Sequence, residues 1–225
     1  IQIVICIDEF QQISDFEDSK TFQKKLRSVW QLQQHVSYCL FGSKKHLMNE
    51  LFEKKNLPFY KFGDAIYLAK IETKYWIEYI CKRFENTGKH ISPELAEEIC
   101  RLVDNHSSYV QQLSWLLWIR TINTATTEQL SYALEDLLDQ NNILFQSETE
   151  NLSAYQMNFL KAIVDGIHTK FSSKEVISKY NLGTSANIVR LKNALLQKEL
   201  IETNGKEIVL ADPVFEVWFK KEMLY

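Results

Sequence analysis

The sequence has little glycine and proline, and it lacks the short motifs that assign a function directly. Six glycines and three prolines among 225 residues leave few sites for tight turns, so we expect a mostly helical chain. No run of eighteen apolar residues occurs, and we therefore predict no membrane-spanning segment. The pattern Gly-x-x-x-x-Gly-Lys-Ser/Thr, whose backbone amides and lysine hold phosphates, is also absent.

Charge and cysteine usage narrow the function classes further. The net charge of -3 gives no overall attraction to nucleic acid, so a DNA contact would need a local basic patch. The cysteines lie far apart in apolar surroundings and form no Cys-x-x-Cys pair; they are Cys6, Cys39, Cys81 and Cys100. We expect buried, reduced thiols in a cytoplasmic protein.

The first residues of the chain carry its strongest signal. Residues 1–7 are mostly β-branched and show no polar alternation, which predicts a strand covered on both faces in a parallel sheet. Asp8 and Glu9 follow at its carboxyl end, the edge where α/β sheets bind ligands. An Asp-Glu pair there has the composition of a Walker B segment. Asp8 would hold Mg²⁺ through water, and Glu9 would polarise the water that attacks a γ-phosphate.

Two further expectations attach to this segment. A buried strand that runs into a solvated acidic turn is the alternative explanation of Asp8 and Glu9. Because no initiator methionine or basic leader precedes the strand, we also expect that part of the fold N-terminal to Ile1 is missing.

A second strand is predicted close to the first. A helical periodicity over residues 19–34 precedes a short apolar strand at residues 36–41, and this order predicts a right-handed βαβ unit with parallel strands. Ser43 would then reach the same edge as Asp8 and Glu9, where its hydroxyl can bind the γ-phosphate or the attacking water, the role called sensor 1. The alternative for Ser43 is a turn residue that caps the helix predicted over residues 44–55. Alternating apolar residues predict a further, half-exposed strand over residues 64–71.

These motifs, in this order, resemble a known family. The strand before Asp8, the strand into Gly42-Ser43, the Pro58-Phe59-Tyr60 loop and the Ile66-Tyr67-Leu68 segment resemble the C-terminal part of the archaeal-type ATPases in the AAA+ and STAND group of P-loop proteins. The resemblance implies ATP and Mg²⁺ as ligands, followed along the chain by a helical lid and a winged helix. Where the family carries an arginine after Tyr60, this chain has Lys61, a candidate nucleotide contact that supplies charge without the planar fork.

The middle of the chain is predicted to be helical almost without interruption. Helices are expected over residues 73–87, 92–103, 109–122 and 126–144, followed by a polar linker at residues 145–151. This region resembles the family's lid, in which a Gly-Gly-x-Pro turn lies against the adenine. Asn105 and Ser107 stand in the Gly and Pro places, which makes Ser107 a candidate nucleotide contact.

The last third has the pattern of a winged helix-turn-helix. Helices are expected over residues 152–164, 172–180 and 184–197, followed by a hairpin around Asn204-Gly205. Ser172 and Glu175 are spaced as a capping box, so we expect Ser172 to cap the second helix. The ending Asp212-Pro213-Val214-Phe215 with Trp218 resembles the family's own winged helix. The third helix offers four candidate DNA contacts, Thr184, Ser185, Asn187 and Arg190. Because few basic residues accompany them, a winged helix that packs or binds protein is the alternative.

The sequence therefore predicts a mainly α chain with a partial parallel α/β sheet. Its expected domains are the end of a P-loop (AAA+-like) core at residues 1–71, a helical lid at residues 72–150 and a winged helix at residues 151–225. The resemblance implies an ATP hydrolase, active only with the missing P-loop, that couples nucleotide state to the winged helix. The alternative is a DNA-binding regulator or protein-interaction scaffold with a vestigial nucleotide site. A protein partner is expected, and no membrane contact.

Overall fold

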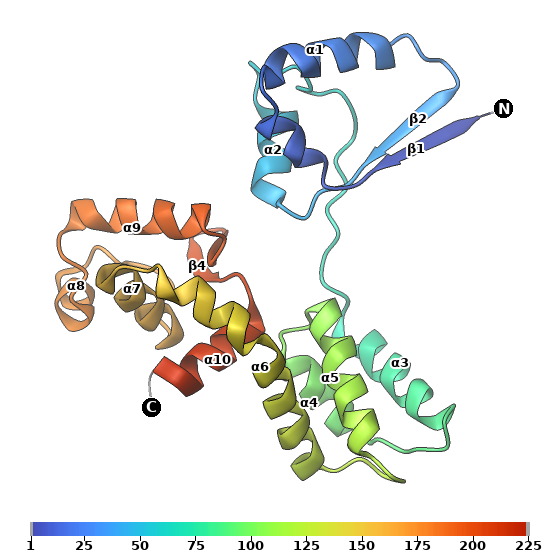
Figure 1. Ribbon diagram of the computed structural model, residues 1–225, viewed down its shortest axis with the longest axis vertical. Coiled ribbons are helices and arrows are strands. Elements are labelled where there is room, and N and C mark those ends of the chain that lie inside the picture. The colour runs from blue at the N-terminus through green and yellow to red at the C-terminus, as the bar shows by residue number, and fades with distance from the viewer. Residues whose placement is uncertain (1, 224–225) are drawn as a thin grey trace. The chain divides into compact units, whose positions relative to one another are not determined.

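The computed structural model describes residues 2–223, and the side chains of all of these except residues 45 and 46. The chain divides into two compact units, Ile1–Leu68 and Ala69–Tyr225, which are treated separately below. Figure 1 shows a small sheet in the first unit and a predominance of helices in the second. The predicted fold class, mainly helical with a small parallel sheet, is confirmed. Within residues 2–223 no helix has both the length and the apolar character needed to cross a membrane.

The first unit is built on two parallel strands. Strand β1 (Ile3–Ile7) pairs with β2 (Val36–Leu40) in the register Ile3 to Val36 through Ile7 to Leu40. A 3₁₀ helix, η1 (Phe10–Asp15), and helix α1 (Ser19–Trp30) connect them, and α2 (Lys45–Glu53) follows β2. The predicted strand-helix-strand order with parallel strands is confirmed.

A small aromatic core holds this unit together. Phe10, Ile13, Leu51 and Phe59 are buried, and the rings of Phe10 and Phe59 meet edge to face with centroids 5.4 Å apart. The Arg27 guanidinium donates hydrogen bonds to the carbonyls of Pro58 and Tyr60, which ties the loop after α2 to α1. The loop that follows α2 is therefore held in place from α1.

The structure corrects two predictions about strands. Strand β1 is exposed rather than covered on both faces, with Val4 at 65% and Ile5 at 38% exposure. Within the described residues β1 belongs to a sheet of two strands, and the core covers one face of it. The predicted strand over residues 64–71 is irregular and exposed, because its backbone pairs with no described strand.

The second unit begins with four helices, called here the helical group: α3 (Thr73–Glu85), α4 (Pro93–Leu102), α5 (Ser107–Arg120) and α6 (Thr127–Glu150). Ser92 caps α4 by accepting a hydrogen bond from the Leu95 amide at 3.2 Å, as the sequence predicts for a Ser-Pro helix start.

The winged helix follows in the predicted order. It comprises α7 (Ala154–Val164), α8 (Lys174–Tyr180), α9 (Ser185–Gln197), the antiparallel strands β3 (Ile201–Asn204) and β4 (Glu207–Leu210), and α10 (Pro213–Met223). Two local predictions are off by one residue. Ser173 rather than Ser172 caps α8, and the hairpin turns at Gly205 and Lys206 because Asn204 still pairs with Glu207.

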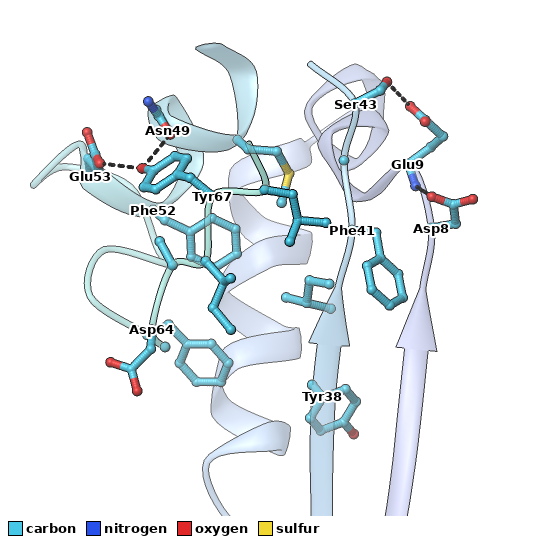
Figure 2. Close-up of a pocket in the computed structure, with 18 of the residues that line it drawn as sticks. Asp8, Glu9, Tyr38, Phe41, Ser43, Asn49, Phe52, Glu53, Asp64 and Tyr67 are labelled. Carbon is cyan, nitrogen blue, oxygen red and sulfur yellow. Dashed lines mark hydrogen bonds between the residues drawn. The ribbon is translucent and has the colours of Figure 1, made fainter. Parts of the chain in front are cut away.

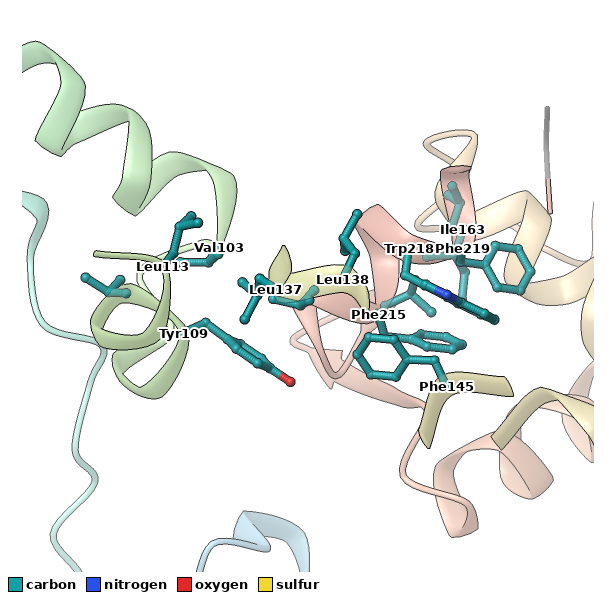
Figure 3. Packing of buried hydrophobic residues seen from close by; sticks show 14 of the residues in the cluster. Val103, Tyr109, Leu113, Leu137, Leu138, Phe145, Ile163, Phe215, Trp218 and Phe219 are labelled. Carbon is teal, nitrogen blue, oxygen red and sulfur yellow. The ribbon is translucent and has the colours of Figure 1, made fainter. Parts of the chain in front are cut away.

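The linker predicted at residues 145–151 is wrong, because α6 continues through Glu150. Phe145 is 1% exposed, and its ring lies 5.3 Å from that of Phe215 and 5.6 Å from that of Trp218 (Figure 3). The Trp218 indole N–H also donates to the Asn142 side-chain oxygen at 2.9 Å. Helix α6 thus joins the helical group and the winged helix in one core. The domain boundaries at residues 71 and 150 stay predictions.

A hydrogen-bonded junction adds to this core. The Tyr109 hydroxyl on α5 donates to Asp212 Oδ2 at 2.5 Å, and Asp212 Oδ1 accepts the amides of Val214 and Phe215 at the start of α10. Burial, and then the hydrogen bond to Asp212, raise the pKa of Tyr109 far above its usual range. Burial, and then the charge of Asp212, raise the pKa of Glu148 on α6. The neutral phenol is therefore the form that the fold selects.

Tyr109→Phe is expected to destabilise the protein by about 1.5–3 kcal/mol, because it leaves the half-buried Asp212 carboxylate short of one donor. Urea unfolding at neutral pH measures the loss. The matched control is Tyr132→Phe, whose exposed hydroxyl lies 3.5 Å from Glu128 and whose removal should cost below about 0.5 kcal/mol.

The pH dependence of this effect has a defined sign. Above the ordinary tyrosine pKa of 10.0 the unfolded chain loses the Tyr109 proton while the folded protein keeps it. The contribution of Tyr109 to the free energy of unfolding therefore falls as the pH rises beyond 10.0. The difference in unfolding free energy between the wild type and Tyr109→Phe should narrow over the same range. A gap that widens above that pH would contradict the assignment.

Candidate functional site

One pocket of about 710 Å³ lies in the first unit, at the carboxyl ends of β1 and β2 (Figure 2). Its rim at the strand ends is formed by Asp8, Glu9, Gly42 and Ser43. Its other walls come from Trp30 at the end of α1, from β2 and Phe41 after it, from α2 and from the segment at residues 62–68. Parallel strands deliver their carboxyl ends to one edge, which is why residues 34 positions apart in sequence meet here.

Glu9 is the best-anchored polar side chain of this rim. Its carboxylate oxygen Oε2 accepts a hydrogen bond from the Ser43 hydroxyl at 3.2 Å and another from the Gln11 side-chain amide. Its backbone lies in the left-handed region, with φ of 48°, and its amide donates to Asp8 Oδ1 at 2.9 Å. The structure thus brings together the three side chains, Asp8, Glu9 and Ser43, to which the sequence assigned catalysis and metal binding. Their chemical roles stay predictions.

Sequence reasoning missed the residues that position Glu9. Gln11 is 2% exposed, yet a glutamine in a 3₁₀ helix carries no recognisable pattern. Gly42 packs closely against two side chains. A Cβ there would lie 2.4 Å from the Gln11 side-chain oxygen and 2.6 Å from the Met48 side chain, so a larger residue requires these flexible side chains to move. The Gly-Ser pair was a usable signal, but the close approach of Gln11 and Met48 emerges from packing.

The charge of the pocket decides what it can bind. Four carboxylates line it, those of Asp8, Glu9, Glu53 and Asp64, and no lysine or arginine is among the lining residues whose side chains the structure describes. Oxygen ligands of this kind suit Mg²⁺, which takes one or two carboxylates and completes its shell with water and phosphate. No three acidic, histidine or cysteine side chains among the described residues are grouped closely enough to hold a metal alone. The described part of the pocket therefore fits a hydrated Mg²⁺ and carries negative charge, which disfavours a triphosphate without the ion.

The apolar wall of the pocket is partly fixed by Tyr67. Its hydroxyl donates to the side chains of Asn49 and Glu53 on α2, at 2.8 and 3.0 Å. The hydrogen bond that Tyr67 donates to Glu53 raises the pKa of Tyr67. The irregular segment that was expected to form a strand is thus attached to α2 by side-chain contacts.

Two predicted nucleotide contacts are not placed at this pocket. Lys61 does not line it: its backbone has φ of 50°, its amide donates to the Phe52 carbonyl at 3.0 Å, and its ammonium lies 5.6 Å from the Tyr60 ring centre. Ser107 is the first residue of α5, in the second unit, and is exposed. Asp104 and Asn105 before it adopt left-handed angles, with φ of 47° and 53°, the conformation that glycine favours.

The candidate DNA contacts lie at the start of α9. Thr184 caps this helix, and Thr184, Ser185 and Arg190 are exposed. Asn187 is half-buried, and its side-chain amide donates to the Leu182 carbonyl at 2.9 Å, so it is engaged within the protein. Three of the four predicted residues are therefore accessible to a partner.

Comparison with known proteins shows which solved structures have a similar fold. A family model described as a probable winged helix domain matches residues 143–221, and no curated protein matches the chain. The solved Walker-type ATPase paby2304 of Pyrococcus abyssi superposes with a TM-score of 0.73 at 17% identity, covering 97% of this chain and 63% of that one. The ADP form of the Aeropyrum pernix ORC2 protein superposes with a TM-score of 0.50 at 13% identity, covering 96% of this chain and 64% of that one.

The chain therefore has a fold similar to that of the Pyrococcus abyssi Walker-type ATPase, and residues 143–221 match a winged helix domain. It spans 63% of the length of the Pyrococcus abyssi protein. This agrees with the family resemblance carried by the sequence motifs. The match of the winged helix model begins at residue 143, inside α6, which is consistent with the packing of Phe145 in the winged helix core.

Proposed function

We propose that this chain is the C-terminal portion of an ATP-dependent molecular switch, with its nucleotide site at the pocket of the first unit. The observation that carries the proposal is the convergence of Asp8, Glu9 and Ser43 on one rim, with Ser43 bonded to Glu9 at 3.2 Å. The fold similarity to a Walker-type ATPase supports it. So does the ADP form of the Aeropyrum pernix ORC2 protein, whose fold is also similar.

Each rim residue has a distinct role in this proposal. Asp8 would hold the Mg²⁺ of MgATP, and the ion would supply positive charge that offsets the phosphate oxygens. Glu9 orients and polarises the attacking water, and Gln11 and Ser43 keep its carboxylate in one position. Ser43 exchanges its bond to Glu9 for one to the γ-phosphate, which lets the site register whether that phosphate is present. Lys61 and Ser107 remain candidate nucleotide contacts.

The output of the switch is proposed to pass through the second unit as a whole. Because α6 carries both the helical group and the winged helix, these parts share one core and cannot shift independently without opening it. The nucleotide state would therefore reposition the unit Ala69–Tyr225 rather than the winged helix alone. We expect that a protein partner of the winged helix binds differently in the two nucleotide states.

The negative charge of the pocket leads to a prediction of weak MgATP binding by the 225-residue chain. The four carboxylates, with no lysine or arginine among the described lining residues, repel a triphosphate, so calorimetric titration with MgATP should show a Kd weaker than about 1 mM. The complete protein, tested alongside, should bind in the micromolar range once a phosphate-holding loop is present. Micromolar MgATP binding by the 225 residues would show that phosphate is gripped elsewhere and would overturn this account of the pocket.

DNA binding by the winged helix is the second candidate function. The observation that favours it is the exposure of Thr184, Ser185 and Arg190 at the start of α9. It is tested with the whole 225-residue chain, because a fragment starting at residue 152 would lose Phe145 from the winged helix core. We expect weak binding to duplex DNA at 150 mM salt, with a Kd of about 10 μM or higher, since phosphate contacts need clustered positive charge. Tighter, strongly salt-dependent binding would favour the regulator over the switch if Arg190→Ala abolishes it and Lys192→Ala, at a half-buried position of the same helix, weakens it less.

A further inference from the structure

Two acidic side chains lie together where the winged helix joins the helical group. Glu148 is in the last turn of α6, and Asp212 immediately precedes α10. Both are half-buried, their charges act on each other, and both act on Tyr109 of α5. We call these three side chains the seam. All of them belong to the second unit, so the behaviour of the seam does not depend on the nucleotide site.

Helix α6 turns Glu148 toward the winged helix. Phe145, three residues earlier, is 1% exposed and packs against Phe215 and Trp218 of α10 (Figure 3). Residues three apart lie on the same side of a helix. Thr149, the next residue, is also buried. Glu148 therefore lies on the side of α6 that the winged helix covers, rather than on the side that faces solvent.

The two carboxylates of the seam are supported very differently. Asp212 accepts three hydrogen bonds, one from the Tyr109 hydroxyl and two from the amides of Val214 and Phe215. Among residues 2–223, Glu148 has no hydrogen-bond donor and no ion-pair partner, and the charge that acts on it is that of Asp212. A half-buried carboxylate beside a like charge is costly to keep ionised. The fold thus satisfies Asp212 and leaves Glu148 unsupported.

The other titratable groups around the seam do not neutralise Glu148. The His106 ring lies 4.7 Å from that of Tyr109, and its Nδ1 is buried without a partner in the described part of the chain. Glu216 on α10 is paired with Lys220 at 2.8 Å, and Glu150 on α6 is exposed. A proton from solvent is therefore the simplest means of removing the charge of Glu148.

We propose that the seam is an acid-sensitive latch, in which uptake of one proton by Glu148 tightens the packing of the winged helix on the helical group. The proton removes the repulsion between the two carboxylates and the cost of the half-buried charge. Asp212 keeps its three donors throughout, so the hydrogen bonds that join α5 to the start of α10 are not exchanged. Loss of the proton loosens the same joint.

The pH dependence of the latch has a defined sign. Burial, and then the charge of Asp212, raise the pKa of Glu148 above the ordinary value of 4.5. Between 4.5 and the raised pKa the folded protein holds a proton that the unfolded chain has lost. The contribution of Glu148 to stability is therefore complete below pH 4.5 and is lost as the pH rises through the raised pKa.

Glu148→Gln tests the latch in the 225-residue chain, because glutamine resembles the protonated side chain at every pH. At pH 7.5 we expect the urea midpoint of Glu148→Gln to exceed that of the wild type by roughly 0.2–0.5 M. The difference should shrink as the pH is lowered and vanish near 4.5, where the wild type is protonated as well.

The matched control is Glu150→Gln. It removes the same charge from the same end of α6, where a negative charge is unfavourable in any case, but from an exposed position. We expect its urea midpoint to lie within about 0.1 M of the wild type at both pH values. The excess effect of Glu148→Gln then measures the seam rather than the helix end.

Amide hydrogen exchange locates the effect. The Val214 and Phe215 amides donate to Asp212 Oδ1 at 2.7 and 3.0 Å, so they report opening of the joint. At pH 7.5 Glu148→Gln should slow their exchange about twofold or more relative to the wild type.

Equal urea midpoints for Glu148→Gln and Glu150→Gln, or a difference from the wild type that stays constant down to pH 4.5, would overturn the proposal. Unchanged exchange at Val214 and Phe215 would do the same. A pH dependence that persists in Glu148→Gln and disappears in His106→Asn would assign the titration to His106 instead.

Discussion

Glu9→Gln in the complete protein is expected to lower ATP turnover by about two to four orders of magnitude while nucleotide binding stays nearly unchanged. Glutamine has the same shape and can still accept the hydrogen bond from Ser43, so the rim keeps its geometry. It cannot take up the proton of an attacking water, because a neutral amide is not a base at neutral pH. Single-turnover hydrolysis and a separate binding titration distinguish the two effects.

The matched control for Glu9→Gln is Asp64→Asn. Asp64 lines the same pocket, and Asp64→Asn removes one negative charge, as Glu9→Gln does. No role in hydrolysis is assigned to Asp64. If the two variants lose turnover equally, the effect reflects pocket charge rather than a catalytic carboxylate. If Glu9→Gln hydrolyses ATP at the wild-type rate, the assignment of Glu9 as the residue that activates water is wrong.

Phe145→Ala is expected to destabilise the second unit by about 3–5 kcal/mol, because it leaves a cavity beneath Phe215 and Trp218. For a unit of this size such a loss lowers Tm by roughly 10 °C. Calorimetric melting should show the helical group and the winged helix unfolding together, since α6 carries residues of both. If Phe145→Ala lowered the melting temperature of the winged helix alone, the helical group and the winged helix would be separate domains.

The neighbouring Ile143 provides the control for this prediction. Its side chain is 83% exposed on the same helix, so Ile143→Ala should change stability by less than about 0.5 kcal/mol. A large loss in both variants would point to helix propensity as the cause, whereas a loss confined to Phe145→Ala identifies the buried aromatic contact. The two positions are two residues apart, and on a helix they therefore point in different directions.

Local sequence patterns were sufficient for most helices and for the strand order. The Ser-Pro start of α4, the helix between the parallel strands and the hairpin near Gly205 are all features of short segments, and each was confirmed. The convergence of Glu9 and Ser43 followed from the same logic, because the carboxyl ends of parallel strands share an edge.

Burial was harder to predict than element type. The β-branched residues of β1 suggested a strand covered on both faces, but within this chain the core reaches one face. Alternation over residues 64–71 suggested a strand, yet a strand needs a partner and the described chain supplies none to it. A polar composition after residue 144 suggested a linker, although one face of the continuing helix is buried at Phe145 and Thr149.

The sequence by itself determined the class of the fold, the order of its elements and the strand end at which acidic and hydroxyl groups gather, because periodicity and turn chemistry are local properties. Only the tertiary structure decided which side chains position Glu9, which side chains pack against Gly42 and that the helical group and winged helix share a core. It also decided that Cys6 and Cys39, predicted to be buried, are exposed register partners on β1 and β2. Such facts depend on contacts between segments far apart in the chain, and a local pattern does not contain them.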